Sequence, residues 1–377
     1  MKKITAIAAA FAVCLSLCGC MHHTELDEQA IVEAVGIDYS EGEYEVTVQY
    51  FNIEGTGGSS PIDQSKKNVI NVSGKGADVS TALESASVRC GRSFMYGITT
   101  LIVLGRDVLT EDISRTLSFT ESYYQSNPSV LVAASDGKAK DILSVKFKEG
   151  IVSIEKLEML LENSEYHGMG EYVKILQLLS EQRRRDAGTA LPLLKAVETE
   201  TDATDDGKTV EISGGILLVN RNYVSDLTLN QMSGLQLLSE HPKNALVSAD
   251  MNGEKVGVTV YNMRCDIEHE FENGKLKFNI DFHADGKYTD SQLENKNASF
   301  SGEVEKVCSI ILEKRIFDAL GETVIARGCD PCGLKYVISS EDYGEWLKIE
   351  DNFSELLQNA VFEIECDIDI DRFGIAH

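Results

Sequence analysis

Hydrophobic positions along the first half of the chain follow two periods, and each period predicts a different kind of element. Alternating apolar and polar residues, typical of half-buried strands, begin with a hairpin pattern over 31–50 that turns at a Glu-Gly pair. Strands are predicted at 31–37, 44–50, 68–73, 99–104 and 129–134, and helices at 79–90, 111–125, 153–163 and 170–184. Strands that alternate with helices in this way predict an α/β domain.

The C-terminal half has a different order. Residues 265–271 and 276–282 both alternate apolar and polar positions, and Asn273-Gly274 between them is a strong signal for a β-hairpin. Helical spacing follows over 302–320, and a closing strand is predicted at 361–370. This order predicts an α+β layer. The expected fold is therefore α/β and α+β, a multidomain protein of mixed sheets with flanking helices.

The first 20 residues fit neither period. Lys2 and Lys3 precede an apolar run that is too short to cross a bilayer comfortably, and the run ends in Leu17-Cys18-Gly19-Cys20. This arrangement resembles a bacterial lipoprotein signal, in which the cysteine after glycine is lipidated; an ordinary signal peptide with an incidental cysteine is the other interpretation. We expect a lipid-anchored extracytoplasmic protein whose Cys20 carries a covalent diacylglycerol and acyl lipid, and we expect no other cofactor.

An acidic stretch divides the rest of the chain. Residues 199–208 are polar, lack an apolar period and are typical of a linker. The C-terminal region after this stretch is either one unit or two, a small middle domain at 209–250 and a C-terminal domain at 251–377. The expected organisation is a signal peptide at 1–19, a lipid anchor and tether at 20–30, an N-terminal α/β domain at 31–198, the linker at 199–208 and the α+β region at 209–377.

Charge narrows the classes of partner. The 377 residues include 61 Asp or Glu and 35 Lys or Arg, so the formal net charge is −26. Such a surface repels a phosphate backbone, and nucleic acid is not expected as a partner. It also repels anionic headgroups, so the lipid on Cys20, not surface charge, would hold the protein at a membrane.

A Cys-x-x-Cys motif is the clearest candidate for chemistry. Cys329 and Cys332 have redox spacing, but a reactive pair normally begins a helix, and here Gly333 and an apolar run follow. A disulfide or reduced structural pair, a redox pair and part of a metal site all stay open, although zinc would need two more ligands. No catalytic residue and no metal site is assigned, because no nucleophile triad or paired-carboxylate motif stands out. We do not expect an enzyme.

Three other motifs favour structural roles. The segment 73–76, Ser-Gly-Lys-Gly, looks like a fragment of a phosphate loop but lacks its first glycine and its ending, so we expect a turn into the helix at 79. His269 shares a strand face with Phe271 and is expected to be an inner histidine with a hydrogen-bond partner. Asp367, Asp369 and Asp371 alternate with isoleucines, which predicts the solvent-facing side of a strand more than a calcium site.

The order of motifs resembles the Ger(x)C family, the lipoprotein C subunits of spore germinant receptors. The match runs through the mature chain in order and departs at Met21-His22, where the family usually has Trp-Asp. The residues that carry it are Cys20, Glu25-Leu26, Ala30-Ile31-Val32, Gly36-Ile37-Asp38, the segments 73–76 and 137–143, Gly215–Val219, Gly234–Leu238 and Glu345–Ile349.

The resemblance implies a non-enzymatic subunit on the outer face of the spore inner (cytoplasmic) membrane. It implies a membrane A subunit and a permease-like B subunit as partners in nutrient sensing, a mixed α/β fold in three domains, and Cys20 as the one functional residue carried over. Two rival functions remain. One is a solute-binding lipoprotein of a transporter, which the unlike order of elements in the two halves disfavours; the other is a thiol-redox lipoprotein that uses Cys329 and Cys332.

Overall fold

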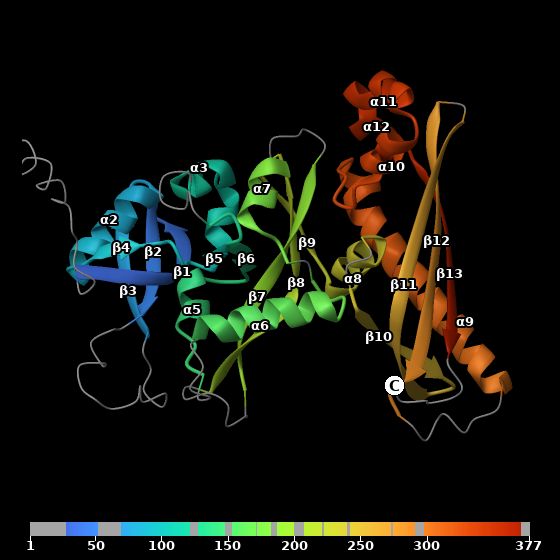
Figure 1. Cartoon of the computed structure of the whole chain (residues 1–377), viewed down its shortest axis with the longest axis horizontal. Coiled ribbons are helices and arrows are strands. Elements are labelled where there is room, and N and C mark those ends of the chain that lie inside the picture. Colours follow the sequence, from blue (N-terminus) through green and yellow to red (C-terminus); the bar gives the residue numbers. More distant parts are fainter. Residues whose placement is uncertain are drawn as a thin grey trace, which may run out of the picture.

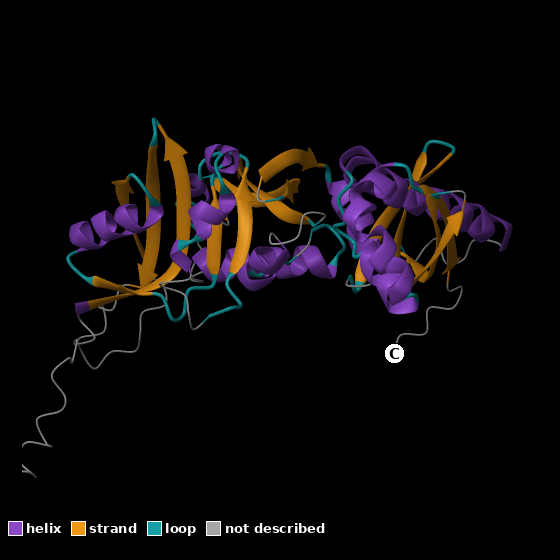
Figure 2. Cartoon of the chain, turned by 90° about the horizontal axis from the view of Figure 1, so that it is seen from above, coloured by secondary structure: helices purple, strands orange, loops and turns teal. Residues whose placement is uncertain are grey.

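The computed structural model describes residues 28–51, 69–120, 127–147, 153–170, 172–181, 187–199, 207–220, 222–239, 242–272, 274–290 and 298–370. The described residues form two lobes along the long axis of the molecule, each built on one sheet (Figure 1, Figure 2). The expected fold, mixed sheets with flanking helices, is confirmed. The residues predicted to form the signal peptide, and Cys20, lie outside the described residues.

The first sheet contains nine described strands in the order β3-β2-β1-β5-β6-β7-β8-β9, with β4 beside β1. Its centre, β1-β5-β6-β7, is parallel, and antiparallel hairpins extend it on both sides. The strands are β1 Gln29–Ser40, β2 Glu43–Phe51, β3 Val69–Gly76, β4 Ser93–Met95, β5 Leu101–Leu104, β6 Leu131–Ser135, β7 Gly188–Glu198, β8 Lys208–Val219 and β9 Asn222–Leu227. β1 begins at Gln29, which lies within the range 20–30 expected for the anchor and tether.

Helices cover both faces of this sheet, so its central strands are apolar on both sides, as parallel strands usually are. On one face lie α2 (Val79–Cys90), the 3₁₀-helix η3 (Arg106–Thr110), α3 (Ile113–Leu117) and α7 (Ile175–Glu181). On the other lie α5 (Ala139–Leu143) and α6 (Ser153–Tyr166). Every residue of β5 and β6 is buried.

The helix predicted at 79–90 is confirmed as α2, which Asp78 caps by accepting a hydrogen bond from Thr81 N at 2.8 Å. The turn expected at 73–76 is wrong, because these residues continue β3 as far as Gly76. Glycine is needed at Gly74 for packing: a Cβ there would collide with backbone atoms of Ala82 and Ala86 in α2. The segment is thus a strand against which a helix lies closely.

The acidic stretch at 199–208 connects two neighbouring strands of one sheet, which corrects the linker expected there. β7 and β8 pair along their whole length, from Gly188 opposite Val219 to Glu198 opposite Lys208. Thr199 N also donates to Gly207 O at 2.8 Å. The sequence pattern missed this because a polar hairpin connection and an interdomain linker have the same composition. The middle domain considered at 209–250 is also corrected, since β8 and β9 complete the first sheet.

The second sheet has four described strands, in the order β10-β11-β12-β13, with β12 and β13 parallel. The hairpin predicted around Asn273-Gly274 is confirmed as β11–β12, and Gly274 has φ +79°. The strands are β10 Asn244–Met251, β11 Glu254–Glu272, β12 Lys275–Tyr288 and β13 Val361–Ile370. The helices are α9 Ala298–Leu320, with a π-helical turn η5 at Gly321–Ile325, then α10 Leu334–Glu341, α11 Tyr343–Ile349, the 3₁₀-helix η6 at Glu350–Asn352 and α12 Phe353–Gln358.

The helix α9 lies against the inner face of this sheet, where its fully buried positions meet Phe278, Ile280 and Phe282 of β12. These helix positions recur every four residues, at Val304, Cys308, Leu312 and Ile316. The outer face of the sheet is exposed and polar. None of the described helices is both long and apolar enough to cross a membrane.

The helix α8 (Leu229–Leu238) joins the two lobes. It begins with the capping box of Thr228 and Gln231, and it crosses α9 so closely that a Cβ on Gly234 would overlap the carbonyl of Arg315. The buried amide of Gln236 accepts from Gly170 N at 3.0 Å and donates to Gly170 O at 2.6 Å. One small cluster of buried residues combines β7, β8, α8 and α9.

Candidate functional site

The cysteine pair singled out by spacing lies at the junction of the lobes. Cys329 is fully buried in the cluster beneath α8, and its thiol donates to the carbonyl of Thr323 at 3.3 Å. Cys332 packs against the same cluster. Both are free thiols in this structure.

Electrostatics at this pair oppose thiolate chemistry. Asp330, between the two cysteines, accepts from Leu334 N at 2.7 Å and from Lys335 N at 2.9 Å, so a carboxylate already occupies the start of α10. Burial and then the charge of Asp330 raise the pKa of Cys329 to about 12, and both causes raise the pKa of Cys332 well above its usual range. A reactive Cys-x-x-Cys pair needs a lowered pKa. Of the interpretations left open, the geometry favours a reduced structural pair.

Two motifs far apart in the sequence meet in the first lobe. Asp38, which ends the Gly-Ile-Asp motif, accepts from Ala139 N at 2.7 Å and from Lys140 N at 3.1 Å. These residues begin α5, within the segment 137–143. Burial raises the pKa of Asp38, while the two backbone N–H groups oppose that shift. Gly36 lets the helix approach, because its Cβ position is 3.1 Å from the Cβ of Ala139.

This contact gives both motifs a structural role. The carboxylate satisfies two N–H groups that every helix leaves without a partner at its beginning. Spacing within the sequence could not reveal the pairing, since more than 100 positions separate its partners. A buried Asp at the end of an apolar strand was the available signal, because such a carboxylate needs donors.

The inner histidine expected at position 269 connects the second sheet to the helices at its end. The side chain of His269 is 6% exposed; its Nδ1 is 2.8 Å from an oxygen of Glu341 in α10, and its Nε2 is 3.8 Å from an oxygen of Glu345 in α11. Carboxylates from α10 and α11 therefore lie near one buried imidazole of β11. His269 Nδ1 nevertheless makes no hydrogen bond among the described residues, so the hydrogen-bond partner expected for this side chain is not confirmed at that atom.

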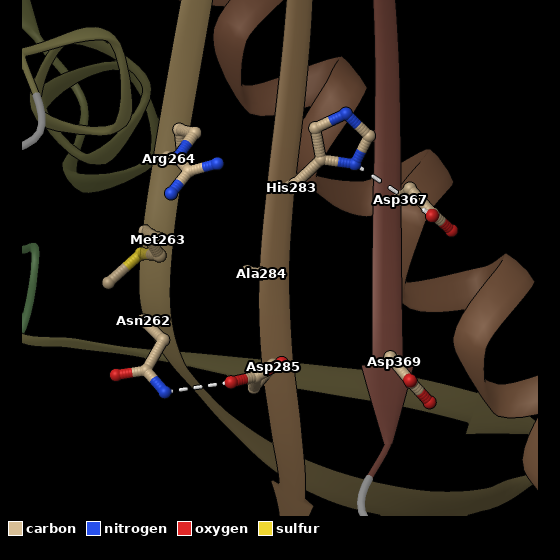
Figure 3. Close-up of a pocket in the computed structure, with 8 residues that line it drawn as sticks. All are labelled: Asn262, Met263, Arg264, His283, Ala284, Asp285, Asp367 and Asp369. Atoms are coloured by element: carbon tan, nitrogen blue, oxygen red, sulfur yellow. Dashed lines mark hydrogen bonds and ion pairs between the residues drawn. The ribbon is translucent and has the colours of Figure 1, made fainter.

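A hollow of about 510 Å³ opens on the outer face of the second sheet (Figure 3). Side chains from β11, β12 and β13 line it: Asn262, Met263, Arg264, His283, Ala284, Asp285, Asp367 and Asp369. A bulge in β11 shapes one wall, because the register with β12 shifts between Tyr261 and Arg264. Asn262 has φ +50° in this bulge and donates from Nδ2 to Asp285 Oδ2 at 2.7 Å.

The chemistry of this hollow is that of a polar contact surface. Its lining holds three carboxylates against Arg264 and one histidine, and His283 Nδ1 is 3.8 Å from Asp367 Oδ2 with both side chains largely exposed. Exposed ion pairs of this kind contribute little to stability. The prediction that Asp367 and Asp369 face solvent is confirmed, because both residues of β13 are exposed; Asp371 lies outside the described residues. Within the described ranges, no group of three or more His, Cys, Asp or Glu side chains has the arrangement of a metal site.

Comparisons with known proteins agree with this architecture. The family described as "Spore germination protein N-terminal domain" matches residues 22–196, and the family described as "Spore germination B3/ GerAC like, C-terminal" matches residues 213–374. Spore germination protein KC of Bacillus subtilis (strain 168) is 22% identical over 390 residues, which covers 95% of this chain and 92% of that protein. Spore germination protein A3 of the same organism is 20% identical over 294 residues, or 78% of this chain and 76% of that one.

A solved structure shares the fold. The crystal structure of the GerBC protein superposes with a TM-score of 0.58 and 15% sequence identity, and the match covers 89% of this chain and 96% of that one. The first family match ends at residue 196, in β7, and the second begins at residue 213, in β8, so the β7–β8 connection lies between them. Together the two matches span most of the chain. The chain therefore belongs to the Ger(x)C family of spore germination proteins.

Proposed function

We propose that this chain is the non-enzymatic lipoprotein C subunit of a nutrient germinant receptor. The observation that carries the proposal is the pair of consecutive family matches, over residues 22–196 and 213–374. The lipoprotein-like signal supports the anchor: a covalent diacylglycerol and acyl lipid on Cys20 would hold the folded body on the outer face of the spore inner membrane. The candidate sites among the described residues are a polar hollow on the second sheet and two aspartates that cap helices.

The partners in this proposal are a membrane A subunit and a permease-like B subunit. The names of the relatives, spore germination proteins KC and A3, support a place in the same kind of assembly. The hollow around Arg264 and Asp285 is open, polar and formed by three strands, which suits recognition of a protein surface more than enclosure of a small nutrient. No nucleic acid is expected among the partners, because the net charge is −26.

The two rival functions have less support. A solute-binding lipoprotein would have two similar lobes around a cleft, whereas this chain has a nine-stranded and a four-stranded sheet of different order. A thiol-redox lipoprotein would need a stabilised thiolate at Cys329 or Cys332, and the pKa of both thiols is raised.

A cysteine substitution in spores tests the anchor. We expect Cys20→Ala to release the protein from the membrane fraction and to slow germination in response to nutrients, because no acyl chain would then hold it. Cys18→Ala is the matched control, since it changes a neighbouring cysteine of the signal and should leave both properties unchanged. Membrane-bound Cys20→Ala protein with normal germination would contradict the proposal.

A second experiment tests the partners. Affinity purification of the tagged protein from detergent-solubilised spore membranes should bring down a permease-like protein and a second multi-pass protein, and mass spectrometry would identify them. Recovery of the tagged chain without either membrane protein, from an extract in which both are detected, would count against the receptor assignment.

A further inference from the structure

A β-bulge in β1 directs an additional acidic side chain towards α6. The register between β1 and β2 shifts between Val32 and Ala34, so Glu33 is the extra residue. Ala34 packs in the same apolar cluster as α6. Glu33 lies close enough to α6 for the charges of Glu155 and Glu158 to act on its carboxylate.

Two carboxylates of this group are partly buried without full compensation. Glu33 Oε2 and Glu158 Oε1 are buried atoms that have no hydrogen-bond partner among the described residues, whereas Glu155 is exposed. Burial, followed by the negative charges of Glu155 and Glu158, raises the pKa of Glu33 from 4.5 to about 7. Burial also raises the pKa of Glu158. An ionised carboxylate is costly in such a place, so a proton held by Glu33 relieves the group.

The titratable groups around this cluster are mainly acids. Glu162 acts on Glu158, and Tyr172, which precedes α7, has a pKa raised by burial and by Glu162 and Glu158. Two cations lie in the same region: Lys156 of α6, which follows Glu155 in the sequence, and Lys174, whose Nζ is 5.9 Å from the centre of the Tyr172 ring. The charges of α6 that shift the pKa of Glu33 are nevertheless those of Glu155 and Glu158, and they oppose its ionisation.

Thr100 ties the bulge to the helix. Its N–H donates to Glu33 O at 2.9 Å, and its hydroxyl is 3.3 Å from the same carbonyl oxygen. The side chain of Thr100 also acts on Glu158, where it opposes the rise in pKa that burial causes. Glu158 Oε1 is still left without a hydrogen-bond partner among the described residues.

The far end of α6 reaches the second lobe. Figure 1 shows α6 extending beneath the first sheet towards α8. At that end Lys243 N donates to the carbonyl of Tyr166 at 3.2 Å, and Gly170 follows with its two hydrogen bonds to Gln236 of α8. The position of α6 is therefore linked to the contact between the lobes.

We propose that Glu33, Glu155 and Glu158 form a protonation-sensitive latch that holds α6 against the first sheet. With Glu33 protonated, the helix is seated by its apolar face, through Leu157 and Leu161. With Glu33 ionised, three like charges face one another and loosen the helix. The change is passed to the second lobe through Tyr166 and its neighbours.

The stability of the seated helix depends on pH because Glu33 has a different pKa when α6 is seated and when it is open. The pKa of Glu33 is higher when α6 is seated than when the carboxylate is free in water, so the stabilisation is present at low pH and is lost as pH rises through about 7. In the open form, in which α6 has left the first sheet, the pKa of Glu33 returns from about 7 to 4.5. The open form is therefore about tenfold more populated at pH 8 than at pH 6.

Hydrogen–deuterium exchange of the full mature chain tests the latch. After correction for the intrinsic pH dependence of amide exchange, peptides that cover α6 should exchange about tenfold faster at pH 8 than at pH 6. Glu33→Gln should abolish this rise and keep α6 protected, because the amide imitates the protonated acid. Glu84→Gln, on the exposed face of α2, is the matched control and should behave as wild type.

A second variant keeps the test decisive if Glu33→Gln folds poorly. Glu158→Gln removes one of the charges that raise the pKa of Glu33, so the carboxylate should ionise at a lower pH and the rise between pH 6 and pH 8 should shrink. Equal protection of α6 at pH 6 and pH 8 in the wild type would overturn the latch. The same rise in both Gln variants as in the wild type would also overturn it.

Discussion

Two aspartates perform the same task in the two lobes. Asp38 accepts from two N–H groups at the start of α5, and Asp330 accepts from two N–H groups at the start of α10. Both side chains are buried, with 6% and 5% of their surface exposed. A buried carboxylate is tolerated only when donors surround it, and a helix start supplies them. Asp38 and Asp330 are therefore structural anchors, even though each lies within a motif that suggests chemistry.

Replacement of Asp38 tests this role. We expect Asp38→Ala to lower the free energy of unfolding by roughly 2–3 kcal/mol, because a cap is lost and two buried N–H groups are left without partners. Urea denaturation of the purified protein would measure the change. Asp141→Ala, an exposed position on the same helix, should stay within about 0.5 kcal/mol of the wild type. Equal effects of the two substitutions would show that the cap contributes nothing specific.

Single residues were predicted from the sequence to different degrees. The inner histidine at 269 and the solvent-facing side of the strand at Asp367 followed from alternation, because a strand fixes which side chains share a face. The roles of Asp38 and Glu33 did not, since both depend on a helix more than 100 positions further along the chain. Cys20 remains a prediction from the signal alone.

Elements with strong local signals were predicted well. The hairpin β11–β12 and the helix α2 follow from turn residues, caps and apolar spacing within a few positions. Within the range predicted as a helix at 111–125, the structure places α3 at Ile113–Leu117, and Asp112 caps it by accepting from Ser114 N. The end of a helix is therefore predicted less well than its presence.

The crossing of α8 and α9 gives a prediction at the scale of elements. Gly234→Ala should lower the free energy of unfolding by roughly 1–3 kcal/mol, because the new Cβ would overlap the carbonyl of Arg315 and approach Ala319 at 2.8 Å. Thermal unfolding would report the change. Gly321→Ala, at the end of α9, has nothing within 4 Å of its Cβ position and should be neutral or slightly stabilising. A Gly234→Ala protein as stable as wild type would mean that the two helices can separate at little cost.

At the scale of the whole molecule, strand pairing and sequence families divide the chain at different places. The first family match ends at residue 196 and the second begins at residue 213. The composition of the residues between them also predicts a linker. The first sheet, however, continues across this boundary to the end of β9 at Leu227. Composition cannot distinguish the two cases, because pairing between β7 and β8 is decided by the rest of the sheet. The structural boundary therefore lies in α8, between the two sheets.

Fragments of the chain would decide between these two boundaries. A fragment of residues 28–227 keeps the whole first sheet, whereas 28–198 leaves every position of β7 without its partner in β8 and exposes buried side chains such as Leu191 and Leu193. An unpaired strand edge of this length favours aggregation. We expect the longer fragment to give a cooperative thermal transition and dispersed amide resonances, and the shorter one to aggregate or unfold. For the second lobe, residues 229–377 keep α8 on α9 and should be more stable than 242–377. Cooperative folding of 28–198 on its own would place the boundary at the acidic stretch after all.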